Sequence, residues 1–162
     1  MTELDEWPDQ AKADTNLMLD LVGPFAQSMI RRDGIILPCG AGVTVDGALE
    51  PFAVDPGMEF PEMNDAFSFL VSSVIQERDR YRAVCLVVAV TLPDGRDALR
   101  FLVERRSRGC AALLMEFRRV GLRQVVFDDL APVPVEPVVW GLDQGPRRVV
   151  FFAVPWHGRQ AG

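Results

Sequence analysis

The sequence predicts an α+β fold: one antiparallel sheet of about five or more strands with two main helices. Two observations predict it. Apolar residues recur at three- and four-residue spacing in two segments, which is typical of helices that bury one face. Between and after these segments, short apolar runs alternate with turns containing glycine and proline, which is typical of strands. The expected order is α-β-β-α-β-β-β with a further C-terminal hairpin, and the helices are expected to gather on one face of the sheet.

The first helix is expected from Ala13 to about Arg32. Gly23-Pro24 interrupts the pattern, and a proline inside a helix removes a hydrogen bond, so we expect a kink or a restart there. Arginines in the last turn followed by Gly34 are typical of a helix end. The apolar face of this helix combines six side chains: Leu17, Met18, Leu21, Val22, Phe25 and Met29.

A hairpin is expected next, from Ile35 to Val54, because Asp46-Gly47 suits a tight turn that needs positive φ at both central positions. The second helix is expected over about residues 61–80. Pro61 fits its first position, and the spacing of apolar residues after Met63 is regular.

The third part of the chain predicts further strands. Ala83 to Leu92 is apolar on both faces, which indicates a central strand covered on both sides. Strands are also expected at 98–106, 110–118 and 122–127, an extended proline-rich connector at 131–137, and a final hairpin from 138–140 and 148–154. Residues 13–154 are therefore expected to form one domain between a flexible acidic tail, 1–12, and a second flexible tail, 155–162.

Two resemblances follow from these patterns. Over about residues 13–127 the element order resembles the roadblock, longin and profilin-like group of folds. The segment from Arg32 to Gly47, RDGIILPCGAGVTVDG, resembles a group of small uncharacterised bacterial proteins in which a helix is followed by a glycine, an apolar pair, a proline and a strand ending in Asp-Gly. Pro93 to Arg96 and Glu104 to Arg106 are similar to further motifs of that group. Neither resemblance implies an activity, because fold alone does not define function.

Composition limits the classes of function. The 162-residue chain is 49% apolar and carries a net charge of −6. No signal peptide is visible, and the longest apolar stretch is about half of the roughly twenty residues that a membrane span needs. Three cysteines that are far apart in sequence indicate buried thiols in a reducing compartment, so we expect a cytoplasmic protein without a membrane partner.

Charge is unevenly distributed along the chain. Residues 1–65 carry 13 acidic and 3 basic side chains, whereas residues 96–123 carry 3 acidic and 8 basic ones. The arginines of this basic segment are candidates for a surface that binds a ligand or a partner: Arg100, Arg105, Arg106, Arg108, Arg118 and Arg119. The alternative is a solvated sheet face with charges that block edge pairing. Nucleic acid is disfavoured, because the isoelectric point is near 4.8.

Aromatic residues near the C-terminus are candidates for an interface: Trp140, Phe152 and Trp156. The alternative for them is core packing.

No catalytic set stands out. The only histidine, His157, lies in the C-terminal tail. Cys39, in Pro-Cys-Gly-Ala-Gly, is either a reactive thiol or a small packed residue, and the glycines beside it favour close backbone packing over a phosphate loop. The carboxylates Glu59, Glu62 and Asp65 suit the start of a helix, and Asp128-Asp129 suits a turn. We expect no metal and no cofactor.

The sequence therefore favours a non-enzymatic protein-interaction module that associates with itself or with another protein. One alternative is a sensory domain, or one that binds a small anionic ligand, in which arginines hold the anion. A further alternative is an enzyme that uses Cys39 or a carboxylate. Opposed charge patches mainly affect specificity and association rate, so association by such a module is expected to weaken with salt.

Overall fold

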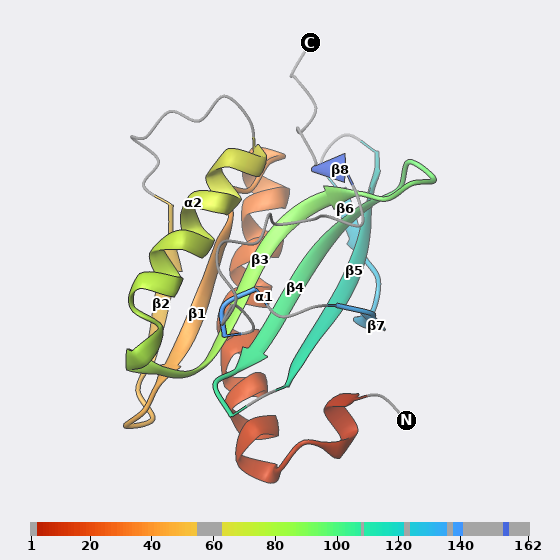
Figure 1. The fold of residues 1–162 in the computed structure, drawn as a ribbon. Coiled ribbons are helices and arrows are strands. Elements are labelled where there is room, and N and C mark those ends of the chain that lie inside the picture. Colours follow the sequence, from red (N-terminus) through yellow and green to blue (C-terminus); the bar gives the residue numbers. More distant parts are fainter. Residues whose placement is uncertain are drawn as a thin grey trace.

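The structure is a computed structural model that describes residues 3–54, 63–107, 109–121, 124–135, 138–140 and 154–155. It confirms the α+β fold and the predicted order of helices and strands (Figure 1). The described elements are, in order, the 3-10 helix η1 (Glu3–Glu6), α1 (Asp9–Asp33), β1 (Cys39–Thr44), β2 (Leu49–Ala53), α2 (Met63–Gln76), the 3-10 helix η2 (Arg78–Arg80), β3 (Tyr81–Thr91), β4 (Asp97–Arg105), β5 (Cys110–Val120), β6 (Gln124–Phe127), β7 (Ala131–Val133) and β8 (Val154–Pro155).

The sheet has the strand order β2-β1-β3-β4-β5-β6, and neighbouring strands are antiparallel. The predicted hairpin of β1 and β2 turns at Asp46-Gly47, and Gly47 has φ +92°. Strand β7 pairs with residues 112–114 of β5, on the same edge where β6 pairs with residues 117–120. Strand β8 pairs with the end of β3. The long apolar strand β3 is central, as its composition predicted.

The two helices lie on opposite faces of the sheet, and here the structure corrects the expectation that both cover one face (Figure 1). Alternate residues of β3 explain the difference. Cys85 and Val87 are buried in the cluster that α1 covers, whereas Leu86 and Val88 are buried in the cluster that α2 covers. A strand that is apolar on both faces needs a cover on both, and one helix supplies the cover for each face.

A kink or a restart was predicted at Gly23-Pro24, and the structure excludes the restart, because α1 runs for 25 residues through Pro24. The carbonyl that loses its partner to Pro24 belongs to Asp20, four residues earlier, and both residues are exposed. Water can therefore bond this carbonyl, so the cost of the proline is reduced. The helix ends as predicted at Gly34, which has φ +72° and donates its backbone N–H to Ile30 O at 2.9 Å.

The first residues differ from the expected flexible tail over 1–12. Helix η1 precedes α1, and Trp7 between them is 5% exposed and belongs to the core on the α1 face. The guanidinium carbon of Arg105 lies 4.6 Å from the centroid of the Trp7 ring. A large aromatic ring stacked on an arginine gives this acidic segment an attachment that its polar composition does not reveal.

A bulge in β3 connects the sheet to α1. The pairing of β1 with β3 shifts between Val43 and Thr44, where Tyr81 faces α2 but Ala83 faces α1. The intervening Arg82 donates to both carboxylate oxygens of Asp14 on α1, at 2.8 and 2.9 Å. The extra residue of a bulge redirects a side chain, and here it joins the sheet to the helix through a two-point ion pair.

The proline-rich connector differs in part from the expectation. Residues 131–133 form strand β7, which is paired with β5 at the edge of the sheet, where prolines are tolerated because no second strand needs their N–H groups. Residues 138–140 form bends and not the first arm of a hairpin. The predicted second arm, 148–154, lies outside the described residues except for Val154 in β8.

Candidate interaction surface

The hairpin of β4 and β5 decides where the predicted arginine surface lies. In its antiparallel register, Arg100 is paired with Leu114 and Glu104 is paired with Cys110. Arg105 and Arg106 therefore lie at one end of the hairpin, and Arg118 and Arg119 lie at the other end. Arg108 is outside the described residues.

Arg105 and Arg106, at the end of the hairpin near its turn, each contact a specific partner. Arg105 stacks on Trp7 on the α1 face, and the Nη1 atom of Arg106 donates to the carbonyl oxygen of Asp79 at 3.2 Å. Arg100 lies on the opposite face, half-buried, and burial lowers the pKa of its guanidinium. The structure thus distributes these three arginines over both faces and does not bring them together.

The far end of the hairpin contains a hollow of about 410 Å³. Arg118 is exposed there, and the guanidinium of Arg119 lies against Gly34 at the end of α1. The hollow is lined by both signs of charge, from Arg96, Asp97, Glu116, Arg118, Arg119 and Asp128. Arg96 also forms ion pairs with Asp94 and Glu116. An anion in this hollow would meet carboxylates as well as arginines.

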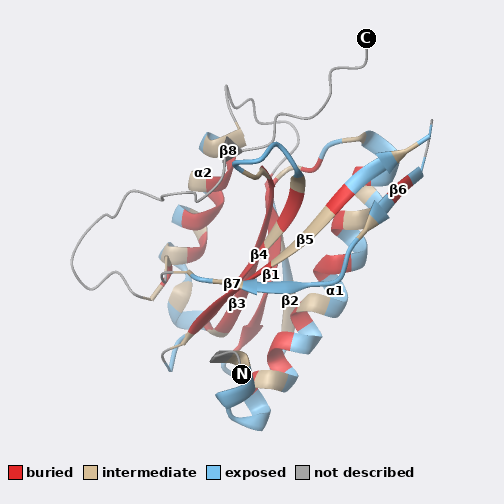
Figure 2. Cartoon of the chain, turned by 90° about the vertical axis from the view of Figure 1, so that its right-hand side faces the viewer, coloured by how far each residue is buried: buried red, intermediate tan, exposed pale blue. Residues whose placement is uncertain are grey.

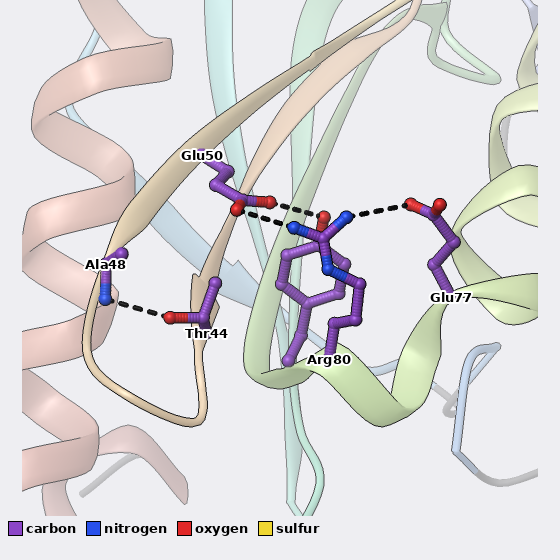
Figure 3. A network of polar contacts seen from close by, with 6 residues as sticks. Thr44, Ala48, Glu50, Glu77 and Arg80 are labelled. Carbon is purple, nitrogen blue, oxygen red and sulfur yellow. Dashed lines mark hydrogen bonds and ion pairs between the residues drawn. The ribbon is translucent and has the colours of Figure 1, made fainter.

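Arg80, in η2 beside the sheet, is also paired with acids. Figure 3 shows Arg80 between two carboxylates, with Nη2 at 2.8 Å from Glu50 Oε1 and Nη1 at 3.7 Å from Glu77 Oε2. The hydroxyl of Tyr81 donates to the other oxygen of Glu50 at 2.8 Å. Burial, together with this hydrogen bond, raises the pKa of Tyr81 to about 12. Arg80 and its neighbours therefore join β2, β3 and η2, which is a structural role.

Glu104 is a buried charge that the sequence did not single out. Its side chain is 1% exposed, and its carboxylate accepts hydrogen bonds from three successive backbone N–H groups, those of Val138, Val139 and Trp140. Arg78 donates to the carbonyl oxygen of Val139 at 3.2 Å. Buried carboxylates need such partners, so Glu104 holds residues 138–140 against the α2 face of the sheet. Its sequence signals were its place among apolar residues in a strand and the resemblance of Glu104 to Arg106 to a motif of the small bacterial proteins.

The interface aromatics are only partly described. Trp140 is half-buried and packs against the core on the α2 face, and its backbone N–H is bonded to Glu104. Its indole nitrogen is buried and has no hydrogen-bond partner among the described residues. Phe152 and Trp156 lie outside the described residues, as does His157.

The candidate catalytic groups lie on different elements of the fold. Cys39 is buried in β1, and burial raises the pKa of its thiol to about 12, so the thiol stays protonated at neutral pH. Asp65 lies in the first turn of α2, and Asp128 and Asp129 follow β6. Glu59 and Glu62 are outside the described residues. Within the described ranges, no group of three or more histidine, cysteine or acidic side chains could hold a metal ion.

The glycines beside Cys39 serve close packing, as the sequence favoured. A Cβ atom at Gly40 would lie 2.1 Å from the carbonyl oxygen of Cys85, and one at Gly42 would lie 2.6 Å from the rings of Phe52 and Tyr81. Both glycines sit inside β1, where they let its neighbours approach.

An exposed apolar stripe on α1 is the feature that the sequence reading missed. Leu17, Leu21 and Phe25 are 43%, 37% and 49% exposed, whereas Met18, Val22 and Ile30 are buried against the sheet. In Figure 2 the side of α1 toward the sheet is largely red and its outer side largely pale blue. Their spacing predicted that Leu17, Leu21 and Phe25 share one buried face with Met18 and Val22. The signal was available, because adjacent apolar pairs at 17–18, 21–22 and 25–26 make an arc too wide for one contact.

Comparison with known proteins adds no assignment: no family model, no curated protein and no solved structure matches this chain. Among the described residues, no helix is long and apolar enough to cross a membrane.

Proposed function

We propose that this chain is a non-enzymatic protein-interaction module that associates with itself. The observation that carries the proposal is the apolar stripe Leu17-Leu21-Phe25 on the outer side of α1. Exposed apolar side chains that occur singly are ordinary, but a contiguous row along one helix is typical of a surface that contacts another protein. Of the eight large apolar side chains exposed in the described part of the chain, only these three share one helical face at a spacing of four residues.

The other candidates have weaker support. The hollow beside Arg118 supports the alternative of an anion-binding domain, but its acidic lining opposes that ligand. The buried, protonated Cys39 does not suit a nucleophile. Three buried free thiols support placement in a reducing compartment such as the cytoplasm.

Sedimentation velocity across a range of protein concentrations tests the proposal. Self-association shifts the weight-average sedimentation coefficient upward with concentration, and raised salt reduces that shift. A sedimentation coefficient that does not depend on concentration, together with a melting temperature raised by an added anion such as phosphate, would favour the anion-binding alternative.

A further inference from the structure

We propose that two copies of this chain pair through α1 in an antiparallel, two-fold arrangement centred on Leu21. The inference rests on the proposed self-association and specifies its surface and symmetry. Three observations carry it: the position of the apolar stripe along the helix, the opposite charges at the two helix ends, and prolines at both edges of the sheet.

The stripe is symmetric about the middle of the helix. Helix α1 runs from Asp9 to Asp33, so Leu21 is its central residue, and Leu17 and Phe25 lie four residues to either side. In an antiparallel pair centred on Leu21, each Leu21 contacts its own copy and each Leu17 lies beside the Phe25 of the second copy. A two-fold interface requires such self-complementarity.

The ends of α1 carry opposite charge. Asp5, Glu6 and Asp9 are exposed at the N-terminal end, and Arg31 and Arg32 are exposed in the last turn. Asp33 is also exposed there and pairs with Arg32, so this end keeps a net positive charge. Antiparallel pairing brings the acidic end of each copy to the basic end of the other, whereas parallel pairing would place like charges together. The helix dipoles are also opposed in this arrangement, which is favourable.

The sheet edges are poor alternatives for self-pairing. Pro51 lies in the middle of the outer strand β2, and Pro132 lies in β7, which shares the other edge with β6. Proline lacks the N–H that an added strand would bond, and edge prolines hinder pairing between sheets. The outer side of α1 remains as the apolar surface that a second copy fits.

The expected dimer is weak. A stable interface buries about 800 Å² on each partner, and three half-exposed side chains on one helix offer less. The measurement therefore needs concentrations from about 10 μM to about 1 mM, which cover dissociation constants in that range.

Two matched pairs of variants test the surface and its symmetry. Phe25→Asp should lower the association constant by at least about tenfold, whereas Phe69→Asp, at a residue on α2 that is 43% exposed, should leave it unchanged. Leu21→Cys should form an intermolecular disulfide under mild oxidation, because Leu21 meets itself on the axis. Phe69→Cys and the wild type, whose three cysteines are buried, should not.

The ends of the helix provide a third test. Arg32→Asp should weaken association, and combining it with Asp9→Arg should restore association, because the exchanged charges then attract again. A dimer that tolerates Phe25→Asp and does not cross-link through Leu21→Cys would overturn this arrangement and leave self-association intact. A monomer at every concentration would overturn both.

Discussion

Replacing Glu104 by glutamine should destabilise the fold more than replacing any exposed glutamate of the sheet. The carboxylate of Glu104 receives three backbone N–H groups on two oxygens in a site that is 1% exposed. Glutamine has almost the same shape but keeps only one accepting oxygen, and its NH₂ group must face an N–H donor. At least one of the three N–H groups therefore loses its acceptor, and the others donate to a neutral oxygen in place of a charged one.

The expected loss follows from these contacts. A hydrogen bond to a charged group contributes about 1.5–3 kcal/mol, and a buried donor left unsatisfied costs about 1–3 kcal/mol. We expect Glu104→Gln to lower the free energy of unfolding by about 2–4 kcal/mol. For a chain of this length, this corresponds to a melting temperature lowered by about 5–15 °C.

Urea unfolding followed by far-ultraviolet circular dichroism measures this loss. The matched control is Glu116→Gln, because Glu116 is also in the sheet but its side chain is 30% exposed and paired with Arg96. The control should lose no more than about 1 kcal/mol. If Glu104→Gln unfolds within about 0.5 kcal/mol of the wild type, residues 138–140 are not held through this carboxylate and the reasoning is refuted.

Three further predictions concern packing, pairing and thiol reactivity. Gly40→Ala should lower the free energy of unfolding by at least about 3 kcal/mol, because the added Cβ would overlap a backbone carbonyl of β3; a soluble variant with wild-type urea stability would contradict this. Asp14→Asn should cost about 1–3 kcal/mol by breaking the two-point contact with Arg82, and the double variant with Arg82→Ala should lose less than the sum of the two single variants. The pKa of the Cys39 thiol is raised to about 12 from 9, so at pH 8 it should react with an aromatic disulfide reagent at least about a thousandfold more slowly in the folded than in the unfolded protein. A thiol that reacts fast in the native protein and is assigned to Cys39 by peptide mapping would disprove its burial.

Sequence patterns were sufficient for the two main helices, strands β1 to β6 and their order. The period of two or of three to four residues reports which side of a strand or helix is apolar, and Asp46-Gly47 and Gly34 mark a turn and a helix end through their backbone requirements. These signals are local, so they can be recognised in the sequence without knowledge of the tertiary structure.

The relative placement of elements was harder to predict. Nothing local to α1 or α2 states which face of the sheet each covers, although the doubly apolar β3 implied that both faces need a cover. Arg100 and Arg105 are separated for a similar reason, because alternation along β4 sends them to opposite faces. The roles of Trp7 and Glu104 depend on partners about a hundred and about thirty-five residues away, respectively, which no pattern in a single sequence reveals.

The central position of β3 has a consequence for how the chain reaches its fold. Eight successive residues, Ala83 to Val90, are apolar and buried, with no charge or proline among them. Such a segment is prone to intermolecular β-aggregation whenever it is uncovered. Strand β4 can pair with it early because it follows within a few residues, but β1 comes from about forty residues upstream and must close a long loop first. Refolding from denaturant should therefore give yields of folded protein that fall as protein concentration rises. The aggregation that lowers the yield should start at the edge of β3 that is still unpaired before β1 arrives.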